Sequence, residues 1–273
     1  MSSRISETFA KLRAENRMAF MPFITAGDPD LETTALTIRE LAARGVDLIE
    51  IGFPYSDPIA DGPVIQASYT RSLGKGLQIS QLFATVSQLT KSQTALPPLV
   101  GMVAYAIIFR MGIETFLKAA REAGFSGLIV PDLPADEAAE MSVLTADHGL
   151  DLIQLIAPTT TRERTQRILE IARGFIYCIS IAGTTGVRDQ LPTELREQLK
   201  WLHTQTKLPL AVGFGVSRPE QVDELRGLAD GIIVGSAIVR QMGAITTDGM
   251  SVAEALQNIG QLAARFVATA HQS

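Results

Sequence analysis

The sequence has few of the residues that form disulfides and metal sites, and no segment that would cross a membrane. Its 273 residues include one cysteine, Cys178, which excludes an internal disulfide. The three histidines, at positions 148, 203 and 271, lie far apart, whereas metal ligands usually come in closely spaced sets. The N-terminus has no apolar core of secretory type, and the longest apolar stretch, 96–109, is too short to span a bilayer. We therefore expect a cytoplasmic protein with no metal and no membrane contact.

The charge of the chain disfavours some kinds of partner, and its composition indicates a folded core. The net charge of −5 and the sequence pI near 5.3 disfavour nucleic acid or an anionic membrane as the main partner. Hydrophobic residues make up 46% and charged residues 19%, which indicates a large buried core and not a disordered chain. Barrels of alternating strands and helices fill about 250 residues as one unit. We therefore expect a single domain over residues 1–273.

Short β-branched apolar runs alternate with longer helical patterns along the chain. Near-continuous apolar runs are typical of parallel strands that are covered on both faces. The predicted strands are 20–25, 48–52, 99–104, 127–130, 152–156, 175–179, 210–214 and 231–234. The predicted helices are 31–44, 113–123, 135–148, 162–171, 193–203, 218–228 and 252–267. The alternation predicts an α/β fold, a (β/α)₈ TIM barrel; an open, doubly wound sheet is the alternative.

Local signals mark several helix ends and two long loops. Residues 3–15 predict an extra N-terminal helix that covers the barrel floor, and Ser217 with Pro219 is typical of a helix start. Glycines at 45, 124 and 149 mark helix ends. The segments 53–79 and 180–193 are long loops after the second and sixth strands. In barrels the functional rim is at the carboxyl ends of the strands, so both loops point to that rim.

Glu50 is the most informative single residue. It lies in a predicted strand between Ile49 and Ile51, and alternation places it on the face opposite both neighbours. If the isoleucines pack against helices, Glu50 points into the barrel. A buried carboxylate is costly, so it has either a paired cation in a structural salt bridge or a role as a general acid or base.

Asp57 and Asp61 follow Glu50 in a segment rich in proline and glycine. An aspartate beside proline is usually a turn former, and Asp57 alone indicates nothing more. Asp61 gains weight from Glu50, because two carboxylates at one rim can take different proton roles in different environments. Asp132, after the fourth predicted strand, lies at the same rim and could organise a loop.

Glycine turns close three late strands. They follow strands six, seven and eight at 182–186, 213–215 and 235–236, and the last opens a short helix. Backbone N–H groups in such turns and at a helix N-terminus bind anions, and barrels commonly hold phosphate after strands seven and eight. These turns predict a small phosphorylated substrate. Tyr177, inside strand six, is either a core tyrosine or a hydroxyl donor in the same site.

Several of these segments together resemble one known family. The chain resembles the alpha subunit of tryptophan synthase over essentially its whole length. The matching segments include MPFITAGDPD (21–30), LIEIGFPYSDPIADGPVIQ (48–66), GLIVPDLP (127–134), VGFGVS (212–217) and GIIVGSAIV (231–239). The second segment is highly specific, whereas the glycine elements alone would fit several phosphate-binding barrels.

The resemblance implies a reaction and its residues. It implies a carbon–carbon lyase of tryptophan biosynthesis that cleaves indole-3-glycerol phosphate to indole and glyceraldehyde 3-phosphate, with no cofactor in this chain. Glu50 would be the catalytic acid and base, and Asp61 the second catalytic carboxylate. The remaining expected substrate-binding residues are Phe23, Ile65, Tyr177, Thr185, Gly186, Phe214, Gly215, Gly235 and Ser236.

The resemblance also implies a partner, a beta subunit that carries pyridoxal phosphate in an alpha2beta2 complex. Pro54, Asp57, Ala106 and Ile107 would contact it. The chain reads Tyr105-Ala106-Ile107 where the family usually reads Tyr-Asn-Pro, which puts that contact in question. Two alternatives therefore remain open: a stand-alone lyase that releases free indole, and a catalytically idle regulatory subunit that binds a phosphorylated ligand.

Overall fold

Eight parallel strands close into a barrel in chain order, each hydrogen-bonded to its sequence neighbours, with β1 next to β8. The computed structural model describes residues 3–59, 61–92, 96–134, 136–179, 191–213 and 215–272. The strands are β1 (Ala19–Thr25), β2 (Ile49–Gly52), β3 (Leu99–Met102), β4 (Phe125–Ile129), β5 (Asp151–Ile156), β6 (Ile176–Ile179), β7 (Leu210–Gly213) and β8 (Gly231–Val234). The closed order confirms the predicted TIM barrel and excludes the open sheet.

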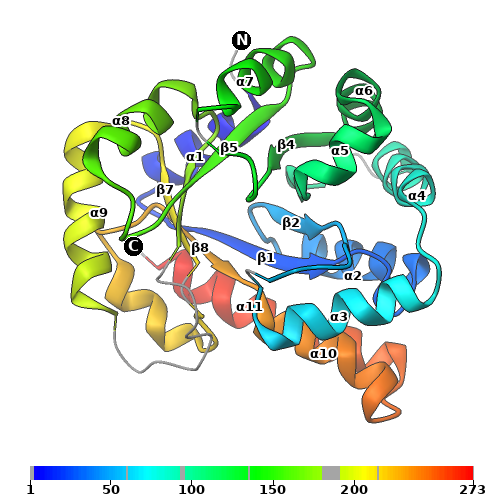
Figure 1. Ribbon diagram of the computed structural model, residues 1–273. Coiled ribbons are helices and arrows are strands. Elements are labelled where there is room, and N and C mark those ends of the chain that lie inside the picture. The colour runs from blue at the N-terminus through cyan, green and yellow to red at the C-terminus, as the bar shows by residue number, and fades with distance from the viewer. Residues whose placement is uncertain are drawn as a thin grey trace.

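Helices surround this barrel (Figure 1). They are α2 (Leu31–Ala43), α3 (Pro63–Gly74), α4 (Ile79–Ser92), α5 (Tyr105–Met111), α6 (Ile113–Ala123), α7 (Ala138–Asp147), α8 (Arg162–Ile171), α9 (Thr193–Gln205), α10 (Ser236–Thr247), α11 (Val252–Ala270) and the 3₁₀ helix η1 (Pro219–Leu225). Outward strand residues such as Ile49 and Ile51 pack against these helices in the main apolar core. Three predicted helix ends are confirmed, because Gly45, Gly124 and Gly149 have φ values of +76°, +101° and +69°.

The N-terminal helix α1 (Arg4–Ala14) closes the barrel floor, as predicted. Its Ile5, Phe9 and Leu12 are buried among the lower inward-facing side chains of the strands. The Ser3 hydroxyl caps the helix at Ser6 N–H and also donates to Asp151 at the start of β5, at 2.5 Å. The interior of the barrel is thus a filled core, and α1 covers it at one end.

Three sequence predictions were wrong about local structure. The segment 53–79 is not one long loop, because it contains α3, which begins with Pro63 in its first turn. Residues 218–228 form the shorter 3₁₀ helix η1 in place of an α-helix, and its start is not capped by Ser217. The Gln221 side-chain oxygen accepts the N–H groups of Ser217 and Arg218 at 2.9 and 3.0 Å.

The prediction also omitted α4 and α5. The α4 pattern of buried Leu82, Phe83, Val86 and Leu89 is helical, so its signal was present in the sequence. The helix α5 has only seven residues, too few to show a period. Of the second predicted loop, residues 180–190 lie outside the described residues.

Candidate active site

Glu50 points into the barrel from β2. It pairs in register with Phe23 on β1 and Val100 on β3, and its side chain is buried. Its Oε1 has no hydrogen-bond partner among the described residues, and none of their cations forms the structural salt bridge considered above. Burial, and secondarily the charge of Asp61, raises the pKa of Glu50 to about 8. At neutral pH Glu50 therefore keeps its proton and can act as an acid.

Asp61 lies just before α3, close enough to Glu50 to raise its pKa. Burial raises the pKa of Asp61 as well, but a hydrogen bond from the Tyr55 side chain opposes that rise. Asp61 is less buried than Glu50 and has a donor that stabilises its charged form. The two carboxylates therefore lie in different environments, which allows a pair to take different proton roles.

Three tyrosines complete this group of titratable side chains. Burial and the nearby carboxylates raise the pKa of Tyr55 to about 12 and raise the pKa values of Tyr69 and Tyr177. All three phenols therefore stay protonated at neutral pH and can donate hydrogen bonds. We call Glu50, Asp61, Tyr55, Tyr69 and Tyr177 the catalytic cluster. Sequence reasoning found Tyr177 and missed the other two.

An apolar wall stands beside the catalytic cluster. Phe23, Ile65, Tyr69 and Val239 form one buried group, with Tyr55, Val64 and Met102 partly buried against it. Phe23 and Ile65 were expected as wall residues, and they do pack together. Tyr69 and Val239 were missed, although Tyr69 follows Ile65 by one helical turn on α3, a spacing that was readable once α3 was known.

Two of the expected phosphate residues lie at the start of α10. Gly235 is its N-cap and Ser236 its first residue, and no side chain caps this end. First-turn N–H groups of a helix lack intrahelical partners and attract anions. Gly215, after β7, has φ +85°, a conformation that favours glycine. The other expected residues, Thr185, Gly186 and Phe214, lie outside the described residues.

The residues expected to contact a partner lie in the loop after β2 and in α5, which follows β3. Asp57 and Ala106 are exposed, Ile107 is half-buried, and Pro54 is buried. Asp132 organises this region, because its carboxylate accepts the Tyr105 N–H at the start of α5, at 2.8 and 3.0 Å. Two large apolar side chains that the sequence reading missed are also exposed here: Ile59 is 82% and Phe109 70% exposed.

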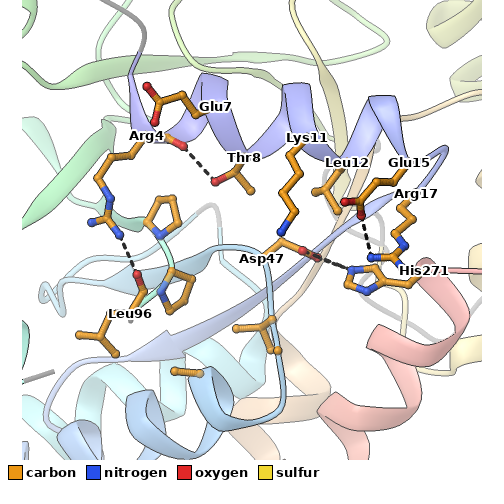
Figure 2. A pocket seen from close by; sticks show the side chains of 15 residues that line it. Arg4, Glu7, Thr8, Lys11, Leu12, Glu15, Arg17, Asp47, Leu96 and His271 are labelled. Carbon is orange, nitrogen blue, oxygen red and sulfur yellow. Dashed lines mark hydrogen bonds and ion pairs between the residues drawn. The ribbon is translucent and has the colours of Figure 1, made fainter. Parts of the chain in front are cut away.

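A cavity of about 550 Å³ lies at the other end of the barrel, beneath α1 (Figure 2). Neither catalytic carboxylate lines it, and most of its charged side chains are engaged with one another or with the backbone. The contacts are Arg17–Glu15 at 2.7 Å, His271–Asp47 at 3.0 Å and Arg4 to the Leu96 carbonyl at 2.6 Å. We therefore assign the chemistry to the catalytic cluster and not to this cavity.

Among the described residues, no three His, Cys, Asp or Glu side chains come together as a metal site would need. In the same part of the chain, no helix is long and apolar enough to cross a membrane.

A closed (β/α)₈ barrel with two unlike carboxylates at its rim defines an acid/base enzyme of the TIM-barrel class. The family model described as tryptophan synthase alpha chain matches residues 9–267. The chain belongs to this family, whose members are lyases that cleave indole-3-glycerol phosphate to indole and glyceraldehyde 3-phosphate in tryptophan biosynthesis.

Relatives and solved structures agree. The tryptophan synthase alpha chain of Rhodopirellula baltica is 47% identical over 239 residues, 87% of this chain and 86% of the relative. That of Gloeobacter violaceus is 44% identical over 261 residues, 95% and 91% of the two chains. The crystal structure of the alpha chain from Legionella pneumophila superposes with a TM-score of 0.87 at 34% identity, covering 98% of this chain and 97% of that one. The Mycobacterium tuberculosis tryptophan synthase structure matches with a TM-score of 0.88 at 33% identity, covering both chains completely.

Proposed function

We propose that Glu50 and Asp61 carry out a retro-aldol cleavage of indole-3-glycerol phosphate. The observation that carries this assignment is the buried Glu50, whose pKa is raised to about 8 beside a second carboxylate. The C–C bond at indole C3 breaks readily only after C3 is protonated, which makes the ring an electron sink. The Glu50 acid supplies that proton.

The second half of the reaction uses the carboxylate that Glu50 has become. It accepts the proton of the glycerol hydroxyl on the carbon attached to C3. The electrons of the O–H bond form the aldehyde carbonyl, and those of the broken C–C bond restore the indole ring. Asp61, whose charged form the hydrogen bond from Tyr55 favours, accepts the indole N–H and stabilises the positive charge that develops there.

The residues around the carboxylates would also hold the indole ring and the phosphate of the substrate. Phe23 and Ile65 would contact the indole ring, with Phe214 as a further expected wall residue. The N–H groups at Gly235 and Ser236 would bind the phosphate, together with Gly186 and Gly215. The uncapped start of α10 supports this placement, because an anion stabilises a helix N-terminus. Thr185 would act with Asp61, and Tyr177 would donate its hydroxyl.

A tryptophan synthase beta subunit is the proposed partner, in an alpha2beta2 complex. The pyridoxal phosphate would belong to that subunit, and this chain would need no cofactor. Exposed Ile59 and Phe109, beside Asp57, Ala106 and Ile107, support a contact here, since large apolar side chains at a surface mark interaction sites. We also propose that residues 1–273 act as one domain in the cytoplasm.

The test is indole release from indole-3-glycerol phosphate by the purified chain, alone and with a beta subunit. We expect slow release by the chain alone and a sharp acceleration when beta is added. Fast release that beta does not change would instead establish the stand-alone lyase. No release under either condition, with phosphorylated ligand still bound, would establish the regulatory subunit and overturn the proposed function.

A further inference from the structure

The helix α3 is held against the end of β1 by a row of polar contacts. They involve side chains on one face of the helix and the residues that end and follow the strand. Ser68 and Thr25 hydroxyls lie 2.6 Å apart, Ser72 donates to the Ala26 carbonyl at 2.7 Å, and Arg71 donates twice to Asp28 at 2.7 and 2.8 Å. A side chain on this helix face therefore has a fixed position relative to the barrel.

Tyr69 stands between these contacts and reaches over the end of β2. Its side chain is 1% exposed, and its ring packs with Phe23 and Ile65. A Cβ built on Gly52 would lie 2.8 Å from the Tyr69 hydroxyl oxygen. Gly52 is two residues after Glu50 and so faces the same side of the strand, the barrel interior. The hydroxyl therefore lies one layer above Glu50, at the mouth of the barrel.

The Tyr69 side chain is buried beside the two carboxylates. The titratable groups that face it are Asp61, Tyr55 and Glu50, and their charges add to the effect of burial in raising its pKa. It is therefore a donor at all physiological pH values. A ligand oxygen at the mouth of the barrel can accept a hydrogen bond from this phenol.

We propose that the Tyr69 hydroxyl is a third catalytic group, a hydrogen-bond donor to the substrate's glycerol hydroxyl between Glu50 and Asp61. The inference rests on the proposed function, because that oxygen exists only on a glycerol side chain. As Glu50 removes its proton, the oxygen gains negative charge before it becomes the aldehyde carbonyl. A fixed phenol donor stabilises that charge without transferring its own proton.

The test removes one oxygen atom from the protein and the matching oxygens from the ligand. Tyr69→Phe keeps the ring against Phe23 and Ile65 and deletes the hydroxyl. Binding is measured by calorimetry in the Glu50→Gln background, which keeps the substrate intact, with indole-3-glycerol phosphate and with indole-3-propanol phosphate, which lacks the glycerol hydroxyls. We expect Tyr69→Phe to weaken the first ligand about tenfold and leave the second unchanged, as for one lost hydrogen bond.

Turnover supplies a second readout in the otherwise unchanged chain. Tyr69→Phe should lower kcat by about tenfold or more, since the contact strengthens as charge develops. Tyr105→Phe, which deletes the hydroxyl of the one tyrosine outside the catalytic cluster, is the matched control and should leave both affinities and kcat unchanged.

The outcomes separate this inference from the function on which it rests. Equal weakening of both ligands, or no change in kcat and in either affinity, would overturn the role of Tyr69 while the parent chain still releases indole. Failure of the parent chain to release indole even with a beta subunit would overturn the proposed function itself.

Discussion

Arg71 on α3 binds Asp28 at two points, with Nε donating to Oδ1 at 2.8 Å and an Nη donating to Oδ2 at 2.7 Å. The Asp28 side chain is completely buried, and the Arg71 side chain is 18% exposed. Gly243 on α10 makes room for this pair, because a Cβ there would lie 2.9 Å from the guanidinium. Three elements, the loop after β1, α3 and α10, thus meet at one charge pair.

Replacing Arg71 should therefore destabilise the chain strongly. Arg71→Met keeps much of the side-chain volume but leaves the Asp28 carboxylate buried without its cation, at a cost of about 3–5 kcal/mol. The free energy of unfolding in urea measures this loss. Adding Asp28→Asn should recover part of it, and Arg39→Ala, on the exposed face of α2, should change stability by less than about 0.5 kcal/mol. If Arg71→Met alone is as stable as the parent, the Arg71–Asp28 pair does not contribute to stability as expected.

Glu50→Gln should abolish indole release and leave substrate binding largely intact. Glutamine keeps the shape of the side chain but cannot deliver a proton to C3. The measurement is turnover together with affinity for indole-3-glycerol phosphate, and circular dichroism controls for folding. Turnover near the parent rate would remove Glu50 from the mechanism.

The same variant should be more stable than the parent, by an amount that depends on pH. The folded chain holds the Glu50 proton up to about pH 8, whereas the unfolded chain releases it around the ordinary pKa of 4.5. The contribution of Glu50 to stability therefore declines as pH rises from about 4.5 to about 8. Glutamine does not titrate, so its advantage should be small near pH 4.5 and on the order of 2–3 kcal/mol near pH 7. Unfolding curves at both pH values measure this difference in stability. If the advantage of Glu50→Gln shrinks as the pH rises, the raised pKa of Glu50 is wrong.

The proposed phosphate site predicts different effects for two substitutions of Gly235. A Cβ at this position would make only ordinary contacts, the nearest at 3.6 Å from Phe23, so Gly235→Ala should bind phosphorylated ligand almost as the parent does. Gly235→Val adds branches that crowd both the ring and the anion, and it should weaken binding of glycerol 3-phosphate by about tenfold or more. Equal affinities for that ligand in both variants would argue against phosphate binding at the start of α10.

Gly52 is a further position where one methyl group should matter. Its Cβ would lie 2.4 Å from Phe23 Cζ and 2.8 Å from the Tyr69 hydroxyl, so one of these wall side chains must move. We expect Gly52→Ala to cost about 1–3 kcal/mol of stability and to lower kcat/KM for indole release. Gly74→Ala, at the end of α3 with nothing within 4 Å of the added atom, is the control and should be neutral or slightly stabilising.

The sequence was sufficient to predict the barrel and the inward direction of Glu50. Both follow from local periodicity: an apolar strand of period two with Ile49 and Ile51 on one side must place Glu50 on the other. The roles of Tyr55 and Tyr69 could not be found in this way. The Tyr69 hydroxyl reaches the carboxylates because α3 lies where a loop was predicted, and Tyr55 lies in the segment that was read only as a loop. The helix was missed because Gly62 and Pro63 were read as loop residues, although proline is favoured in a first helical turn.

The pairing of β1 with β8, which closes the barrel, also affects how the chain folds during its synthesis. One edge of β1 pairs with β2, but its other edge pairs with β8, and the N–H of Met18 donates to the carbonyl of Ala270. On a ribosome, β1 emerges long before either of these late partners. The nascent chain must therefore carry an open strand edge through most of its synthesis, until β8 pairs with that edge and α11 follows.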